Sequence, residues 1–154
     1  DGIMAQESIS EQYLAKALAG LPKGAFLTTA ADGKVNTMTI SWGSIGTLWQ
    51  KPCFMVMVRP SRYTFELIEK STEFTVSIPA GDMDKIGAAG LTLLPGKAVS
   101  VPVIKECGLH FECRIVYKQK MEPALLDGHN DKTWYAAGDY HTLYYGEIVA
   151  VYEK

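Results

Sequence analysis

The alternation of apolar and polar residues predicts a chain made mostly of short strands joined by turns. Ala25–Thr29 and Val35–Trp42 have the composition of strands, and the Asp32-Gly33 pair between them is a typical signal of a tight hairpin. The period of two sorts the second segment into two faces, one with Val35, Thr37, Thr39 and Ser41 and the other with Asn36, Met38, Ile40 and Trp42. The hydroxyl-bearing face is unusual for a core hairpin, although the β propensity of threonine on a solvated face also explains it.

Further strands are predicted downstream of this hairpin. Gly43–Gly46 reads as a flexible connection, and Thr47–Lys51 leads into the next apolar run. The expected strands are Phe54–Val58, Glu73–Ile78, Val99–Val103, Leu109–Met121 and His141–Tyr152. The segment Leu109–Met121 is long enough to bend between two sheets.

A short helix is predicted near the N-terminus. It begins at Ser8 or Ser10, because serine is a favoured N-cap, and it ends in the segment Gly20–Gly24. Its apolar face is formed by Tyr13, Leu14, Ala17 and Leu18. We expect this helix to cap the β structure.

The remaining pattern predicts one mainly β domain over residues 1–154. Helical turns are expected at Met83–Ala89 and Pro123–Asp127, and a polar loop at Gly128–Gly138. Alternating βαβ units are absent, so the fold is expected to be an antiparallel barrel with short capping helices. Residues 1–3, which precede Met4, are expected to be an added remnant outside the fold.

Composition narrows the possible partners. The 154 residues are 47% hydrophobic and 21% charged, as in a single globular domain with an adequate core. The net charge of −2 provides no basic field, so nucleic acid and anionic membranes are poor candidate partners. The sequence has no apolar run of the roughly 20 residues that a transmembrane helix needs, and its three cysteines suit a reducing compartment. We therefore expect a cytoplasmic protein.

The segment after the strand Phe54–Val58 has the chemistry of an anion site. It contains Arg59, Ser61, Arg62, Tyr63 and Thr64 around Pro60. Proline disfavours α geometry at the preceding residue, and serine is a good N-cap, so a helix is expected to start at Ser61. Free amide groups, the helix dipole and two guanidinium groups together suit a phosphate monoester. A basic surface turn is the alternative, and Arg62 is expected to matter more than Arg59, whose side chain could face solvent.

Other combinations of reactive residues do not form a predicted site. Cys107, His110 and Cys113 resemble a metal cluster, but in a strand the two cysteines share one face and the histidine points to the other. No metal site is expected. The sequence has no Gly-x-Ser-x-Gly elbow, P-loop or dinucleotide-binding glycine motif. Cys53 is expected in the core and His129 in a solvated loop.

Five segments, in order along the chain, resemble the flavin reductase-like family of FMN-binding split-barrel proteins, and within it the flavoredoxin branch. They are 36–43 (NTMTISWG), 58–64 (VRPSRYT), 91–96 (LTLLPG), 106–110 (ECGLH) and 138–148 (GDYHTLYYGEI). The resemblance implies a mainly β, antiparallel split β-barrel with short capping helices. It also implies a homodimer that binds FMN noncovalently near the subunit interface.

The resemblance assigns residues to the two ends of the cofactor. Those expected along the flavin ring are Thr37, Met38, Thr39, Ile40, Ser41 and Trp42, with the Thr39 and Ser41 hydroxyls at its polar edge. Those expected around the phosphate are Arg59, Ser61, Arg62, Tyr63 and Thr64. His141 resembles a family position on the nicotinamide side and is the candidate catalytic residue. A structural histidine, hydrogen-bonded in place, is the alternative.

The resemblance leaves three functions open. The first is an FMN-dependent oxidoreductase that passes electrons from NAD(P)H to a flavin or another acceptor. The second is an electron carrier that receives electrons from a partner protein, and the third is a noncatalytic barrel that binds another phosphate ligand. No separate nucleotide-binding domain is predicted, so NAD(P)H would have to dock transiently over the flavin.

Two features bear on assembly and on the lid of the site. The connection from Lys85 to Gly90 is shorter than is usual in the family, either naturally or because a segment is omitted. Aromatic residues gather near the C-terminal strand, as they do in interface cores. They are Trp134, Tyr135, Tyr140, Tyr144 and Tyr145, and their alternative role is to fill the core of their own barrel.

Overall fold

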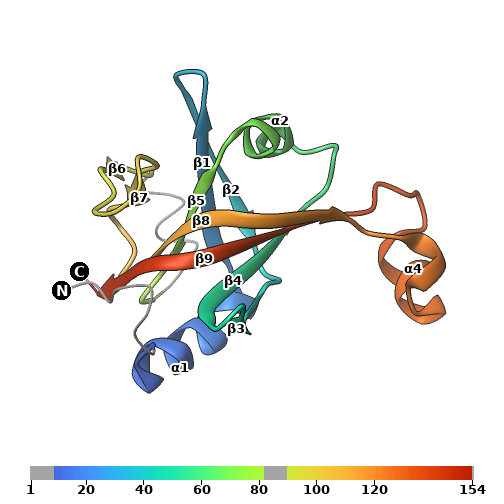
Figure 1. Cartoon of the computed structure of the whole chain (residues 1–154), viewed down its shortest axis with the longest axis horizontal. Coiled ribbons are helices and arrows are strands. Elements are labelled where there is room, and N and C mark those ends of the chain that lie inside the picture. Colours follow the sequence, from blue (N-terminus) through green and yellow to red (C-terminus); the bar gives the residue numbers. More distant parts are fainter. Residues whose placement is uncertain (1–8, 82–89, 154) are drawn as a thin grey trace.

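The computed structural model describes residues 9–81 and 90–153. Its centre is a seven-stranded antiparallel sheet with the order β2-β1-β5-β8-β9-β4-β3, beside a two-stranded sheet of β6 and β7 (Figure 1). In chain order, the elements are α1 (Glu11–Gly20), η1 (Leu21–Lys23), β1 (Ala25–Ala31), β2 (Lys34–Ile40), β3 (Ser44–Leu48), β4 (Lys51–Val58), α2 (Tyr63–Lys70), β5 (Glu73–Ile78), β6 (Leu93–Leu94), β7 (Val103–Ile104), β8 (Leu109–Lys120), η2 (Pro123–Leu125), α4 (Gly128–Trp134) and β9 (Thr142–Glu153). The predicted antiparallel β fold with short helices is confirmed.

The predicted hairpin forms between β1 and β2. Its register pairs Ala31 with Lys34, and the intervening Asp32 and Gly33 have φ angles of 53° and 75°. Two consecutive left-handed residues produce the turn whose twist matches that of the strands. The second strand is shorter than predicted, because it ends at Ile40 and leaves Ser41 and Trp42 beyond the ladder.

Three local predictions are wrong. The expected connection at Gly43–Gly46 is part of β3, which returns to β4 through Trp49 and Gln50, both at positive φ. The expected loop at Gly128–Gly138 contains α4, capped by the Asp127 carboxylate, which accepts from the N–H groups of His129 and Asn130. The expected strand Val99–Val103 is irregular up to Val103, where β7 begins.

Two predictions concern residues that the structure does not describe, and a third is only partly covered. The helical turns over Met83–Ala89 lie outside the described residues. The short connection from Lys85 to Gly90 lies outside them up to residue 89. Of the two expected starts of the first helix, Ser8 is also outside, whereas Ser10 is the N-cap of α1. Ala17 of α1 belongs to the same core as Phe54 and Phe111, so this helix caps the curled sheet as predicted.

A glycine allows the central strands to pack closely. A Cβ atom at Gly146 of β9 would lie 2.6 Å from the ring of Phe74 and 2.7 Å from Cβ of Cys113. Strand β8 pairs with β5 near its start and with β9 along its length, with a register irregularity between Glu112 and Cys113. The rings of Phe54 and Phe111, from strands separated by β9 in the sheet order, lie 5.2 Å apart. The sheet therefore curls around a single core.

A buried carboxylate anchors the loop that joins the two sheets. Glu112 is fully buried and accepts hydrogen bonds from the N–H groups of Lys97, Ala98 and Val99 at 2.7, 2.6 and 3.1 Å. The Tyr152 hydroxyl donates to the same carboxylate at 2.5 Å. Four donors satisfy the charge, which would otherwise be costly to bury.

The cysteines and the histidine of the apparent metal motif lie apart in the interior. Cys113 packs in the main core, Cys107 packs with Phe26 and Ile104, and Nδ1 of His110 lies 3.0 Å from the Ser77 hydroxyl. Cys53 is buried as predicted, and burial raises the pKa of the Cys53 and Cys113 thiols. In the described part of the chain, no three His, Cys, Asp or Glu side chains gather as metal ligands. No described helix is long and apolar enough to span a membrane.

Candidate functional site

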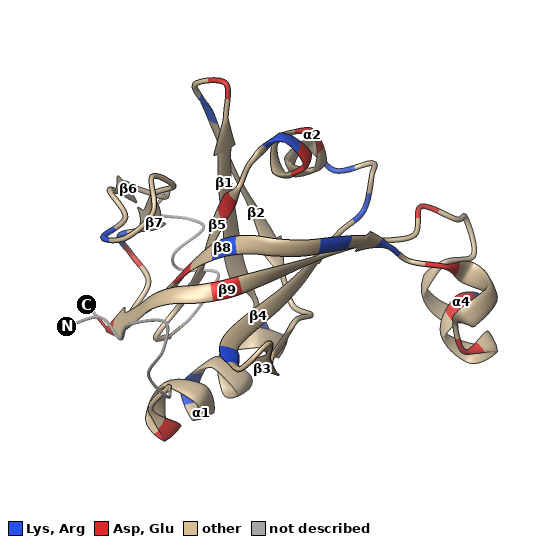
Figure 2. Ribbon diagram, viewed as in Figure 1, with Lys and Arg blue, Asp and Glu red and all other residues tan. Residues whose placement is uncertain are grey.

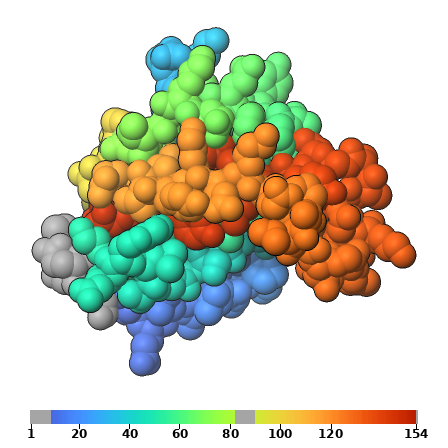
Figure 3. All heavy atoms as spheres, turned by 45° about the vertical axis from the view of Figure 1, so that its right-hand side comes forward, coloured from blue at the N-terminus to red at the C-terminus, as the bar shows by residue number. Residues whose placement is uncertain are grey.

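A pocket of about 250 Å³ lies where the ends of β2 and β4 meet the segment before β9. Its lining residues are Met38, Thr39, Ile40, Ser41, Trp42, Met57, Arg59, Arg62, Trp134 and His141. Three distant parts of the sequence therefore meet in one place, because β4 pairs with β9 and the curl of the sheet brings β2 to them. The segment that carries α4 projects from the body of the molecule beside these strands (Figures 1 and 3).

The residues predicted to line the flavin ring mostly reach this pocket. Met38 through Trp42 line it, and Ser41 and Trp42 lie past the last ladder pair, Ala25 with Ile40. Strand pairing therefore does not use their amide groups. Thr37 is outside the lining, because its hydroxyl lies 2.9 Å from that of Thr28 on the neighbouring strand.

Arg59 does not face solvent, contrary to the expectation for a side chain at a strand end. Its Nη1 donates to the carbonyl oxygen of Asp139 at 3.2 Å, and its Nη2 donates to the carbonyl oxygen of Trp134 at 3.0 Å. The guanidinium carbon also lies 4.7 Å from the centre of the Tyr135 ring. Arg59 thus ties the end of β4 to the segment between α4 and β9.

Ser61 is not the N-cap of α2. The helix begins at Tyr63 with Arg62 as its N-cap, because the chain first makes a turn in which the Arg62 N–H donates to the Arg59 carbonyl at 3.0 Å. Ser61 binds Asp139 instead. Its N–H donates to Oδ1 at 3.1 Å and its hydroxyl donates to Oδ2 at 2.5 Å.

The other three predicted phosphate ligands point in different directions. Arg62 lines the pocket and is exposed, and within residues 9–81 and 90–153 no hydrogen-bond acceptor meets its guanidinium group. Tyr63 is 91% exposed and borders a separate hollow beside the β1–β2 hairpin. Thr64 is buried and accepts a hydrogen bond from the Asn36 amide at 3.0 Å. Of the five predicted ligands, the structure places only the two arginines in the pocket lining.

Charge is divided across this pocket. Basic segments mark the connection between β4 and α2, and an acidic segment marks the loop that follows α4 (Figure 2). The acidic residue of that loop is Asp139, whose carboxylate is bound by Ser61 as described above. The cations therefore belong to one wall, and the carboxylate reaches toward it from the other.

His141 is held as a neutral imidazole. Burial and the nearby charge of Arg59 lower its pKa to about 4, and Asp139 opposes this shift only in part. Its Nδ1 lies 2.6 Å from the Tyr135 hydroxyl, whose own pKa is raised by burial. A phenol hydrogen directed at Nδ1 leaves the ring hydrogen on Nε2. His141 can therefore orient a ligand, but at neutral pH it does not supply the proton of an imidazolium.

Two aromatic side chains complete the pocket wall. The rings of Trp42 and Trp134 meet edge to face at 5.0 Å, and Trp42 lies 5.7 Å from the His141 ring. Both tryptophans keep a solvent-exposed surface, 38% for Trp42 and 50% for Trp134. This is a suitable wall for a flat aromatic ligand that enters from solvent.

Three residues of the site were not predicted as site residues. Met57 could have been found from the period of two in β4, since Val56 and Val58 face the core and Met57 faces the other way. Trp134 was assigned to an interface rather than to the pocket. Asp139 lies in a segment that the resemblance covers, but nothing local indicates that its partner is Ser61.

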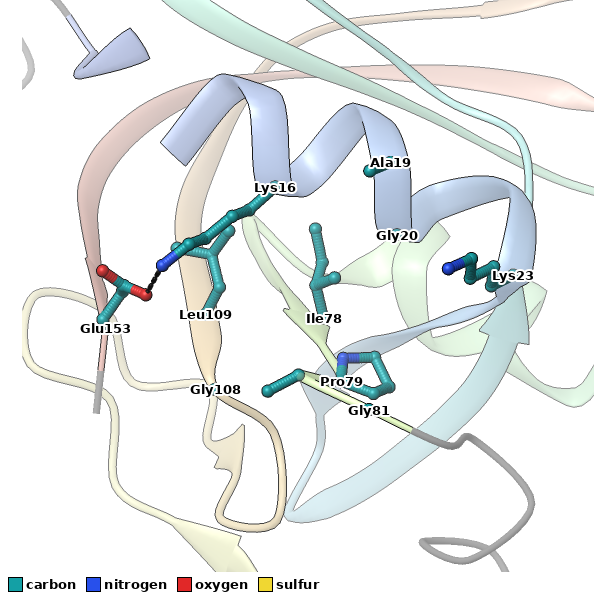
Figure 4. Close-up of a pocket in the computed structure, with 11 residues that line it drawn as sticks. Lys16, Ala19, Gly20, Lys23, Ile78, Pro79, Gly81, Gly108, Leu109 and Glu153 are labelled. Carbon is teal, nitrogen blue, oxygen red and sulfur yellow. Dashed lines mark hydrogen bonds and ion pairs between the residues drawn. The ribbon is translucent and has the colours of Figure 1, made fainter. Parts of the chain in front are cut away.

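A larger hollow of about 600 Å³ lies elsewhere, between α1 and the ends of β5, β8 and β9 (Figure 4). Lys16 crosses its mouth to pair with Glu153, and Lys23 and Ile78 also line it. It contains none of the predicted site residues. We take the smaller pocket as the candidate site, because aromatic rings, two cations and a perturbed histidine converge there.

Comparisons with known proteins agree with this fold. The family described as "Flavin reductase like domain" matches residues 18–154. An uncharacterized protein of Archaeoglobus fulgidus is 31% identical over 145 residues, which cover 84% of this chain and 72% of that protein.

Solved structures are similar as well. The flavoredoxin from Methanosarcina acetivorans has a TM-score of 0.61 and 26% identity, covering 85% of this chain and 68% of that one. An FMN-binding protein from Thermus thermophilus has a TM-score of 0.60 and 20% identity, covering 84% of this chain and 69% of the other. The second likeness concerns the fold alone.

We expect the stability of the protein to fall as the pH is lowered from about 6.5 to about 4, because His141 has a pKa near 4 in the folded chain and about 6.5 when unfolded. In that window the unfolded chain binds a proton that the folded chain does not, so unfolding becomes easier. Partial exposure limits the contribution to roughly 1–2 kcal/mol.

The measurement is denaturant unfolding at pH 7 and pH 4.5. His141→Gln should lose less stability between the two pH values than the wild type. His129→Gln, on the exposed face of α4, supplies the background. An NMR titration midpoint near pH 6.5 for His141 would contradict the expectation.

Proposed function

Because this chain belongs to the flavin reductase-like family, we propose that it binds FMN in the pocket between β2, β4 and β9 and works as an oxidoreductase. The observation that carries the proposal is the convergence of Trp42, Arg62 and His141 in one pocket. A flat aromatic wall, a cation and a neutral histidine suit a flavin ring, its phosphate and a hydride donor, respectively. When bound, FMN would supply the hydride and electron chemistry.

The ring is proposed to lie along residues 38–42. Ser41 and Trp42 have left the β2 ladder, so their amide groups are not engaged in strand pairing. The hydroxyls of Thr39 and Ser41 lie at the same edge of the pocket. Hydrogen bonds from such groups would fix the polar edge of the ring, and Trp42 and Trp134 would exclude water from its side.

The phosphate is proposed to bind at the turn between β4 and α2. Arg62 is the ready cation there, since its guanidinium meets no acceptor among the described residues. Arg59 has a second duty, because its hydrogen bonds to Trp134 and Asp139 hold the opposite wall. Arg62 should therefore act on the phosphate directly, and Arg59 mainly on the shape of the pocket.

NAD(P)H is the proposed electron donor. The exposed faces of Trp42 and Trp134 leave room for a nicotinamide to stack from solvent. His141, neutral and aimed by Tyr135, would then orient the donor through Nε2. An electron carrier that receives electrons from a protein is the second candidate, favoured by the likeness to a flavoredoxin at 26% identity. A cytoplasmic location is part of the proposal, because three buried cysteines suit a reducing compartment.

We also propose that the protein acts as a homodimer. The pocket of about 250 Å³ is smaller than the roughly 300–1,000 Å³ of typical ligand sites, as expected if a second subunit completes it. Beside it, the outer face of β8, β9 and the β3–β4 turn is apolar. Tyr117 lies 5.6 Å from Tyr145, and Trp49 lies 6.5 Å from Tyr145. Leu48 and Trp49, 41% and 64% exposed, extend this face.

Part of the earlier aromatic argument for the dimer is wrong. Tyr144 is fully buried in the core of its own chain, where its hydroxyl donates to Glu69 at 2.6 Å. Tyr135 is also buried and stacks on Tyr140 with ring centres 4.9 Å apart. The dimer proposal therefore depends on Tyr145, Tyr117 and Trp49.

Replacing Arg62 with alanine should raise the Kd for FMN roughly 10- to 100-fold, because a charge-assisted hydrogen bond to the phosphate is lost. The Kd for riboflavin, which lacks the phosphate, should change less than about threefold. Fluorescence titration of both ligands measures this. Lys105→Ala removes one exposed positive charge elsewhere and serves as the matched control. Equal losses for both ligands would refute the phosphate assignment.

Anaerobic addition of NADH or NADPH should bleach the flavin absorbance of the FMN-loaded protein within the turnover time of a flavin enzyme. His141→Ala should slow this bleaching by about 100-fold, because the donor is no longer oriented. Its Kd for FMN should stay within about threefold. Bound flavin that neither dinucleotide bleaches would favour the electron carrier.

Light scattering at micromolar concentration should give the mass of two chains when FMN is bound. Tyr117→Asp, which places a charge on the apolar outer face, should give one chain and weaker FMN binding. Leu125→Asp is the matched control, since Leu125 is 84% exposed and lies away from this face on η2. A one-chain mass for the FMN-bound wild type would overturn the dimer.

A further inference from the structure

Asp139 occupies the donors of the turn between β4 and α2. The Ser61 N–H donates to its Oδ1 at 3.1 Å, and the Ser61 hydroxyl donates to its Oδ2 at 2.5 Å. Both oxygens of one carboxylate are thus bound by the two donors of one serine. An anion belonging to the chain already sits where the proposed phosphate site has its serine.

The backbone of Asp139 is adapted to this contact. Its φ of 57° lies in the left-handed region, directly after Gly138 at 79°. Aspartate tolerates this conformation better than most residues with side chains. The carbonyl oxygen of Asp139 is also bound, by Arg59 at 3.2 Å. The residue is therefore held to the opposite wall through its backbone and its side chain together.

A carboxylate and a phosphate cannot use the same two donors at once. Two anions at hydrogen-bond distance from one serine would also repel each other. Arg62 can attract a phosphate while Asp139 stays in place, because its guanidinium meets no acceptor in the described residues. Ser61 can bind a phosphate only after the Asp139 carboxylate has moved.

We propose that Asp139 is a specificity-determining residue that lowers the preference of the site for phosphorylated over unphosphorylated flavin, by competing with the phosphate for Ser61. The inference rests on the proposed function, because it assumes that flavin phosphate binds at this turn. FMN must displace the carboxylate, whereas riboflavin leaves the contact intact. The preference for FMN is therefore weaker than Arg62 and Ser61 alone would produce.

The competition also reaches the ring end of the pocket. Asp139 lies between Trp134 and His141 in the chain, and both of these line the pocket. The same segment is held by the Arg59 bond to the Trp134 carbonyl. Displacement of Asp139 by a phosphate therefore changes the setting of Trp134, which gives an optical signal.

The test is titration of Asp139→Asn with FMN and with riboflavin. Asparagine keeps the shape and tolerates the left-handed backbone, but it is neutral and holds Ser61 less strongly. The Kd for FMN should fall about tenfold, and the Kd for riboflavin should stay within about twofold. Asp32→Asn is the matched control, since Asp32 has φ 53° and its exposed carboxylate pairs only with Lys70 among the described residues.

A second variant keeps the result interpretable. Ser61→Ala in the Asp139→Asn background should cancel most of the gain in FMN affinity, because the hydroxyl over which the two anions compete is gone. Inorganic phosphate at millimolar concentration should change the tryptophan fluorescence of the flavin-free wild type. The same change should need about tenfold less phosphate in Asp139→Asn.

The outcomes separate this inference from the proposed function. Wild type that binds neither FMN nor riboflavin would end the proposed function, and the inference with it. Wild type that prefers FMN, with Asp139→Asn equal to Asp32→Asn, would overturn the inference alone. A weaker FMN affinity in Asp139→Asn would also overturn it, since Asp139 would then support the phosphate site rather than oppose it.

Discussion

The guanidinium group of Arg59 holds the two sides of the pocket together. It extends from the end of β4 and donates to carbonyl oxygens 75 and 80 residues further along the chain. Those carbonyls belong to Trp134 and Asp139, which bracket the segment between α4 and β9. Without this cation, the segment would be attached to the sheet only through Ser61 and the strands at its ends. The positions of Trp134 and His141, and so the shape of the pocket, depend on one side chain that contributes little exposed charge.

The sheet supplies the frame on which this contact depends. Close passage of β9 over Phe74 and Cys113 requires the absent side chain of Gly146, and this packing curls the sheet until β2 and β4 end at the same place. Glu112 performs a similar service at the other side, where its buried charge organises the backbone of residues 97–99. Local packing and buried charge thus position a pocket whose own residues are largely exposed.

Sequence patterns predicted the parts of this structure that depend on neighbouring residues. The Asp32-Gly33 turn, the strand Glu73–Ile78 and the cap at Ser10 all follow from local chemistry and were found. The turn at Trp49-Gln50 was missed, because neither residue is one that usually adopts left-handed backbone. The partners of Arg59 and Ser61 could not be inferred either, since they lie 75 to 80 residues away and are brought near only by the pairing of β4 with β9.

The depth of the cysteines bears on how the protein would survive its own chemistry. A reduced flavin that meets oxygen yields hydrogen peroxide, which oxidises thiolates far faster than thiols. Here Cys53 and Cys113 are buried, and burial raises the pKa of both thiols, so they stay protonated at neutral pH. Cys107 is equally inaccessible. A flavoprotein built this way resists damage by the oxidant it would leak, and needs no separate thiol protection in an aerobic cell.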